Sequence, residues 1–456
     1  MNRKDFKKYM QQGLGRCILV LQSAERIDKY KEIVLWGCLH NLAYDTQSEG
    51  TRASYMYELT TYFNDEDFFL APCIEAFEKV PRRSDWLFSH FAELLRRFAE
   101  NGNERAALAL KQKYDYLLAV LLNKKRCGSY DFERDNFERV CITLSSLGGT
   151  DILLKIAADM GMLFRKNPHY SGKDFDWFCA SMDDGIGEKR LHSLLKREAK
   201  KSDNIACFYD NYLKATEEIK NFVRTPIEIP QAKDMKNEVT ITGELKPSSG
   251  VRFSHRANGG EKIKLAREVL AEEDLDRKAE MLSAFLFRDE GFPLSHQSII
   301  EYSKSSHERL REVALSVLTA CQSQEVKEYA LRLLEANEYK TQAIQMLLCN
   351  YEPKDKTLLL SVLKEIKIDY RDTSDWHAIG LKILSVCDQG VCLPRDFFVY
   401  VYETTLCSCC REYAVRALAK RRHLTCDMIE ECRFDSNYDI VSYVERYHSK
   451  KSEHCV

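Results

Sequence analysis

The chain has 456 residues, of which 45% are apolar and 30% charged, and its formal net charge is −2. This length exceeds one compact core of the usual size, so we expect several domains or an open-ended repeat array, and the composition excludes wholesale disorder. A nearly neutral chain has no overall field that attracts nucleic acid or anionic lipid, so any such binding must be local.

Turn-forming residues are scarce, since the chain holds only 19 glycines and 9 prolines. Folds built from many short strands need turns rich in these residues, whereas long helices joined by short polar loops do not. The sequence therefore predicts an all-α fold.

The start of the chain is charged, and no apolar run reaches the roughly 20 residues that a membrane span needs. The chain also holds 17 cysteines. Without an export signal we interpret these as reduced thiols, most of them buried. We expect a soluble cytoplasmic protein that does not contact a membrane.

Residues 1–224 are predicted to form an N-terminal helical region. Apolar residues recur at helical spacing in five runs, at 33–42, 55–63, 68–77, 87–98 and 106–122, and short polar breaks separate them as helix connections should. The period is harder to read here than later in the chain. We expect degenerate repeats that continue the C-terminal array.

A glycine-containing turn followed by a basic helix is predicted near the end of this region. Gly185 and Gly187 flank one apolar residue, and six cations then recur at helical spacing: Lys189, Arg190, Lys196, Arg197, Lys200 and Lys201. Residues 175–195 partly resemble the helix-hairpin-helix DNA-binding motif, in which a glycine–apolar–glycine turn holds a DNA phosphate. The resemblance implies that these glycines contact a phosphate and that the basic residues form a phosphate track.

The segment also departs from that motif. Asp183 and Asp184 stand where the motif has an apolar residue and a proline, and two carboxylates repel a phosphate. Leu191 stands where the motif favours alanine. The alternative is a loop between consecutive repeat helices, with the basic residues as an ordinary solvated face.

Residues 225–260 are predicted to be a linker or a projecting loop. The segment carries three prolines and four glycines, and its only strand-like piece is 239–242. A mobile connection between two half-solenoids and a partner-binding arm are both compatible with this composition.

Residues 261–456 contain an eight-residue pattern: a polar residue, two spacers, a small residue, and apolar residues on one helical face. It occurs five times, at 311–318, 327–334, 340–347, 377–384 and 411–418, with the small residue at Ala314, Ala330, Ala343, Gly380 and Ala414. A small residue here lets two helix backbones approach closely, and the flanking leucines fill the space between neighbouring helices.

These copies resemble the HEAT and armadillo class of repeats, mainly over 261–447. The resemblance implies an α-solenoid of stacked antiparallel helix pairs, with a period of about 40 residues that is slightly longer than the one in this chain. The alternative is an irregular helical bundle in which the alanines recur by chance.

No catalytic, cofactor or metal motif stands out. Cys407, Cys409 and Cys410 lie close together in the sequence, with Cys426 and Cys432 further along. Zinc ribbons use paired Cys-x-x-Cys knuckles, so we interpret the cysteines as buried thiols and expect no metal and no cofactor.

The leading hypothesis is therefore a non-catalytic scaffold that binds a protein partner on its concave surface. A nucleic-acid-binding protein that uses the basic helix at 189–201 is the alternative. Trp86, Trp177 and Trp376 each follow an aspartate, and alkylpurine DNA glycosylases built from HEAT-like repeats use an aspartate and tryptophans. The resemblance to these repair enzymes is one of architecture alone, and a DNA-repair enzyme that uses such a pair is the third hypothesis.

Overall fold

The computed structural model describes residues 1–80, 85–124, 132–167, 178–182, 187–224, 257–286, 291–366 and 374–453. Every regular element within these ranges is a helix, which confirms the predicted all-α class. The contacts divide the chain into two compact units. Unit 1 combines Met1–Pro226 with Cys426–Val456, and unit 2 is Ile227–Thr425.

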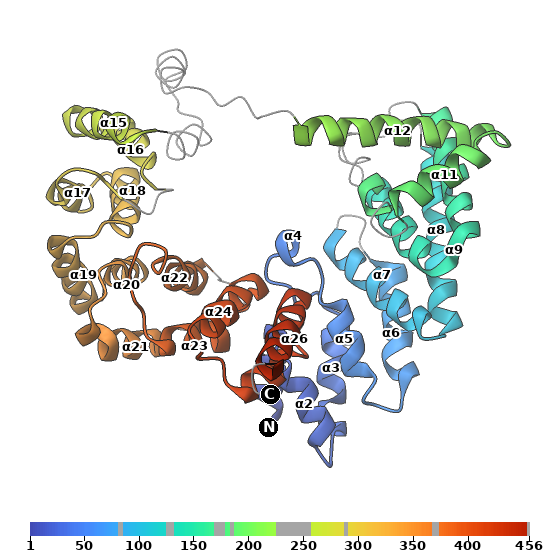
Figure 1. Cartoon of the computed structure of the whole chain (residues 1–456), viewed down its shortest axis with the longest axis horizontal. Coiled ribbons are helices and arrows are strands. Elements are labelled where there is room, and N and C mark those ends of the chain that lie inside the picture. Colours follow the sequence, from blue (N-terminus) through green and yellow to red (C-terminus); the bar gives the residue numbers. More distant parts are fainter. Residues whose placement is uncertain are drawn as a thin grey trace. The chain divides into compact units, whose positions relative to one another are not determined.

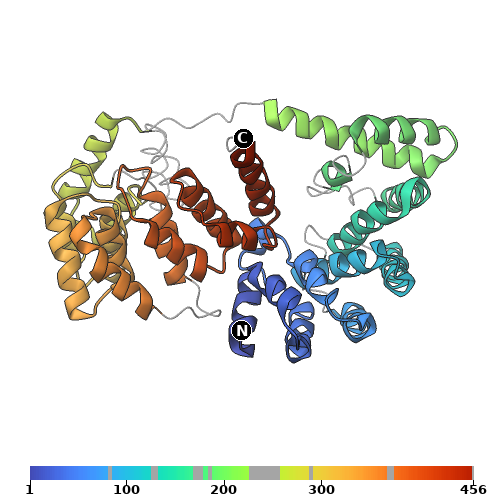
Figure 2. The same cartoon turned by 60° about the horizontal axis from the view of Figure 1, so that its bottom comes forward.

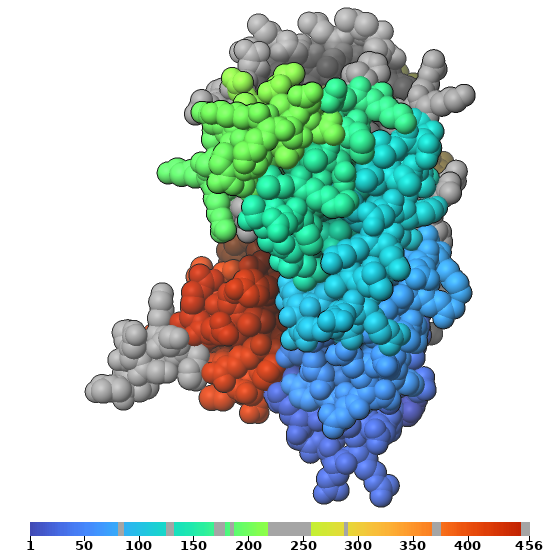
Figure 3. Space-filling model, turned by 90° about the vertical axis from the view of Figure 1, so that its right-hand side faces the viewer, coloured from blue at the N-terminus to red at the C-terminus, as the bar shows by residue number. Residues whose placement is uncertain are grey.

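Unit 1 is a layered stack of helices. Its N-terminal part holds α1 (Arg3–Gln12), α2 (Arg16–Ser23), η1 (Asp28–Tyr30), α3 (Lys31–Cys38), α4 (Thr46–Glu49), α5 (Ala53–Thr60), α6 (Glu66–Lys79), α7 (Asp85–Glu100), α8 (Glu104–Asn123), α9 (Phe132–Lys166), α11 (Glu188–Glu198) and α12 (Asp203–Arg224), and its C-terminal part holds α25 (Cys426–Cys432) and α26 (Tyr438–Glu453). Helices α3, α5, α7 and α9 each pack on the next of the set. Figure 3 shows the same order, from blue at the bottom to green at the top.

The five predicted apolar runs fall on α3, α5, α6, α7 and α8, and each run contributes apolar residues to the core of unit 1. Local capping explains where several of these helices begin. The side chain of Asn103 accepts a hydrogen bond from the amide of Ala106 at 3.0 Å, and that of Asp65 accepts one from Phe68 at 3.3 Å. Such caps satisfy amides that have no partner in the first turn of a helix.

Helix α9 is bent at Gly149, whose φ of 64° and ψ of −157° are not helical. Among the described residues it is the one helix with the length and hydropathy of a membrane span. The bend divides it into halves at 132–148 and 150–166, each shorter than the roughly 20 residues a span needs. Phe137 in one half and Ile156 in the other belong to the core of unit 1.

The C-terminal helices pack on the first helices of the chain, as Figures 1 and 2 both show. Arg16 donates two hydrogen bonds to the carboxylate of Glu431, at 2.7 and 2.9 Å, and the amide of Ser436 donates to the carbonyl of Gly13 at 2.9 Å. The sequence prediction assigned all of 261–456 to one C-terminal region. The contacts instead group Cys426–Val456 with unit 1.

Unit 2 begins within the segment predicted to be a linker. Residues 225–256 of that segment, including its strand-like piece, lie outside the described residues. The first described helix of unit 2 is α15, which begins at Gly259, one residue before the predicted end of the linker. Asn258 and Glu261 form a capping box there, in which each side chain accepts from the other's amide.

The helices of unit 2 form two rows. They are α15 (Gly259–Ala271), α16 (Leu275–Ser283), α17 (His296–Tyr302), α18 (Glu308–Leu318), α19 (Gln324–Ala336), α20 (Lys340–Cys349), η3 (Pro353–Asp355), α21 (Lys356–Glu365), α22 (Ser374–Ser385), α23 (Arg395–Thr404) and α24 (Ser408–Lys420). Helices α16, α18, α20, α22 and α24 each pack on the next, and we call them the inner row. Figure 1 shows α17, α19, α21 and α23 on the outer side of this row.

The eight-residue pattern falls on α18, α19, α20, α22 and α24. Ala314, Ala330, Ala343 and Ala414 are completely buried, as expected where two helices approach closely. Gly380 is buried as well, but a Cβ added to it would meet nothing within 4 Å. The packing at this position therefore accepts a small residue without requiring glycine.

A buried ion pair also connects consecutive helix pairs. The ammonium of Lys327 in α19 lies 2.6 Å from a carboxylate oxygen of Asp355 and 2.7 Å from one of Glu352. Both carboxylates belong to the segment that opens α21. Lys327 and Asp355 are almost fully buried, so removal of the Lys327 side chain would leave the carboxylate of Asp355 without its counter-ion in the interior.

Candidate functional sites

The predicted basic residues lie on one exposed side of α11 and of the turn that follows it. The described members are Lys189, Arg190, Lys196, Arg197, Lys200 and Lys201, and all of them are exposed. Leu191 and Leu195 are buried on the opposite side of the helix, which packs on α12. Helix α11 ends at Glu198, so Lys200 and Lys201 lie in the turn and not on the predicted helix.

Part of this positive charge is balanced locally. One carboxylate, that of Glu198, lies 2.8 Å from the guanidinium of Arg197 and 3.0 Å from the ammonium of Lys201. Hydrogen bonds from Lys201 and Arg197 hold the pKa of this carboxyl below its usual value. These basic residues therefore form a solvent-exposed surface on which Arg197 and Lys201 pair with Glu198.

The predicted phosphate-binding turn is described only at its second glycine. Gly185, Asp183 and Asp184 lie outside the described residues. Gly187 precedes α11 with a φ of 92°, a conformation that residues with a side chain rarely adopt. This backbone conformation accounts for the glycine at position 187, so no bound phosphate is needed to explain it.

The tryptophans of the repair-enzyme comparison differ in their surroundings. Trp376 is buried, with 4% exposure, so its ring is not presented to a base. Trp86 is half-buried, and the guanidinium of Arg139 lies 5.1 Å from the centre of its ring. Trp177 lies outside the described residues.

A cavity of about 310 Å³ is lined by residues of α6 to α9, including Phe88, Lys113 and Glu133. Burial lowers the pKa of Lys113. Its ammonium donates to the carbonyls of Phe77 and Glu78 at 3.0 Å each. These carbonyls belong to the last turn of α6, where helices lack internal donors, so the lysine has a structural role as a cap.

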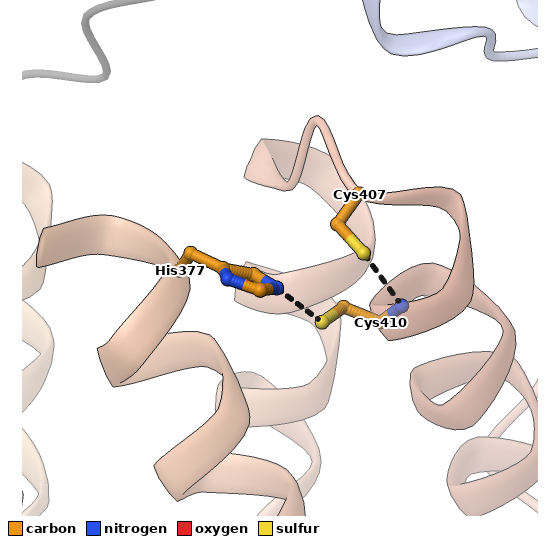
Figure 4. A group of neighbouring side chains, drawn as sticks. All are labelled: His377, Cys407 and Cys410. Atoms are coloured by element: carbon orange, nitrogen blue, oxygen red, sulfur yellow. Dashed lines mark hydrogen bonds between the residues drawn. The ribbon is translucent and has the colours of Figure 1, made fainter. Parts of the chain in front are cut away.

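One group of side chains in unit 2 has the composition of a metal site. The ligand atoms of His377, Cys407 and Cys410 all lie within 4.8 Å of one another. Figure 4 shows the imidazole of His377, from α22, pointing at Cys410 of α24. The distance between His377 Nε2 and Cys410 Sγ is 3.3 Å. Both cysteines are buried, whereas His377 is half-buried.

The start of α24 holds the two cysteines in place. Cys407 is the N-cap residue, and its Sγ accepts a hydrogen bond from the amide of Cys410 at 3.4 Å. The amide of Cys407 itself donates to the hydroxyl of the buried Thr405 at 3.2 Å. An amide that points at a sulfur favours negative charge on it, as at any helix N-terminus.

Sequence reasoning missed this cluster for two reasons. Cys407 and Cys410 have the Cys-x-x-Cys spacing of one zinc knuckle, but the sequence contains no second cysteine pair with that spacing. The third member is a histidine 30 residues before Cys407, on a neighbouring helix of the inner row. His377 and Arg411 occupy the same position in two copies of the repeat pattern. Stacked repeats place equivalent residues on neighbouring helices, and Arg411 directly follows Cys410. This correspondence could therefore have indicated that His377 lies near Cys410.

No protein-family model matches the chain, and no curated protein is significantly similar to it.

Proposed function

We propose that the chain is a HEAT-like α-solenoid that acts as a non-catalytic, cytoplasmic scaffold and binds a protein partner along the inner row of unit 2. The observation that carries this proposal is the consecutive packing of α16, α18, α20, α22 and α24. A row of parallel elements with a repeated small residue is what stacked helical repeats produce, and such rows offer long binding surfaces.

Exposed apolar side chains on the inner row favour a protein as the ligand. Leu381 of α22 is 47% exposed and Tyr413 of α24 is 61% exposed. These two helices pack on each other. Tyrosine is enriched among the anchor residues of protein interfaces, and Leu381 adds an exposed apolar side chain on the neighbouring helix.

Substitution of the two anchors tests the proposal. The double variant Leu381→Asp/Tyr413→Asp should lose the proteins that co-purify with the wild-type chain from its native host, because a carboxylate cannot enter an apolar pocket of a partner. Leu358→Asp is the matched control, since Leu358 is 40% exposed on α21 of the outer row. Retention of every partner by the double variant would refute binding at this surface.

A nucleic-acid ligand is the second candidate, and the exposure of all six cations from Lys189 to Lys201 favours it. Each phosphate contact adds about 0.9 to the slope of log affinity against log salt for duplex DNA. If this function is correct, duplex DNA or RNA binds at low salt, and reversal of Lys196, Arg197, Lys200 and Lys201 flattens the slope. Absence of binding at low salt would eliminate this candidate.

A further inference from the structure

We propose that His377, Cys407 and Cys410 bind one zinc-class divalent ion, which connects α22 to α24, with the fourth coordination position taken by water. Two thiolates and one imidazole are the soft and borderline ligands that zinc prefers. The site would lie between two consecutive helices of the inner row, so the ion would join neighbouring repeats.

The distances suit such an ion. Zinc binds sulfur at about 2.3 Å and imidazole nitrogen at about 2.0–2.1 Å, so two ligands of a tetrahedral ion lie about 3.5–3.8 Å apart. His377 Nε2 and Cys410 Sγ are 3.3 Å apart, and no pair of the three ligand atoms is separated by more than 4.8 Å. Side-chain shifts of a few tenths of an ångström to about 1 Å complete the geometry.

The surroundings of the ligands are already ordered. Cys407 and Cys410 lie in one turn, as in a zinc knuckle, and the amide of Cys410 that donates to Cys407 Sγ can keep that hydrogen bond to a metal thiolate. The half-buried His377 leaves the cluster open on its side. On binding, each thiol releases one proton to the solvent, and His377 coordinates as a neutral imidazole through Nε2.

The neighbouring Cys409 provides a matched control. It lies between the two ligand cysteines, is half-buried and is not part of the cluster. If the thiols bound metal adventitiously, loss of Cys409 would lower the metal content as much as loss of Cys410. If the three proposed ligands form one site, loss of a ligand lowers the metal content and loss of Cys409 does not.

Metal analysis of the untagged 456-residue chain tests the proposal. After purification without chelators, or after dialysis against zinc with reductant, the wild type and Cys409→Ser should hold about one zinc per chain. Cys410→Ser and His377→Gln should hold below about a tenth of that amount. Cobalt(II) added to the metal-free wild type should give the thiolate charge-transfer and intense visible bands of a tetrahedral site, and these bands should be absent from both ligand variants.

Several results would overturn the proposal. They are a wild type that binds neither zinc nor cobalt, an equal loss of metal in Cys409→Ser, and a metal-free chain in which intact-mass analysis finds Cys407 and Cys410 joined by a disulfide. Circular dichroism shows whether Cys410→Ser folds. If it does not, His377→Gln decides the question, because its side chain is half-buried on another helix.

Discussion

At the scale of single residues, the interior of unit 1 holds a histidine whose burial favours its neutral form. His90 is completely buried, and its Nε2 lies 2.9 Å from the carbonyl oxygen of Cys38. Burial lowers the pKa of His90 from 6.5 to about 4, and the hydrogen bond to Cys38 offsets part of that effect. The folded chain therefore takes up this proton only in more acid solution than the unfolded chain does.

His90 should make the chain less stable in acid. Between pH 6.5 and about 4 the unfolded state binds the proton and the folded state does not, so the free energy of unfolding falls as the pH falls, by on the order of 2–3 kcal/mol. Urea unfolding across this range measures the effect. His90→Gln keeps a donor for Cys38 but cannot titrate, so its stability should fall less steeply. Equal slopes for the two proteins would contradict the assignment.

The residues of the metal cluster show the limits of sequence reasoning at this scale. The spacing of Cys407 and Cys410 is visible in the sequence, but His377 reaches them only because α22 packs on α24. The exposed side of 189–201 was predictable, because amphipathic periodicity is a local property. Contacts between residues that are far apart in the sequence are not predictable from local periodicity.

At the scale of helices, local patterns predicted most of the elements. Apolar periodicity located α3 and α5 to α8, and the small-residue pattern located α18, α19, α20, α22 and α24. Pattern alone did not determine which small residues pack tightly. A Cβ on Gly161 of α9 would lie 1.7 Å from the carbonyl oxygen of Asn204 in α12, whereas one on Gly380 would meet nothing.

The two glycines should therefore respond oppositely to alanine. Gly161→Ala forces two helices apart and should lower the free energy of unfolding by about 1–3 kcal/mol. Gly380→Ala fills open space and removes the cost of a glycine in a helix, so it should raise that free energy by about 0.5–1 kcal/mol. Urea unfolding of both variants checks this. A destabilising Gly380→Ala would mean that α22 packs more closely than described.

At the scale of the whole chain, the return of α25 and α26 to the first helices was not predictable. It depends on close contacts between residues more than 400 positions apart, such as Arg16 and Glu431. A Cβ on Gly15 would lie 2.0 Å from the carbonyl oxygen of Glu431. In sequence, a glycine in such a contact is indistinguishable from one in a turn.

Gly15→Ala should loosen this contact. The backbone of Gly15 is in the right-handed helical region, so any effect comes from the added methyl group and not from strain. We expect faster amide hydrogen exchange in α25 and at Ser436, whose amide donates to Gly13. Gly259→Ala serves as the control, because a Cβ there meets nothing within 4 Å. Unchanged exchange in Gly15→Ala would argue against the docking of these helices.

The central claim is that the inner row of unit 2 binds a protein, and site-specific photo-crosslinking in the native host tests it most directly. A photo-reactive amino acid would replace Leu381, Tyr413 or, as the outer-row control, Leu358. The account predicts a covalent adduct with a protein partner at positions 381 and 413 and none at 358. Adducts at 358 alone, or none at 381 and 413, would contradict it.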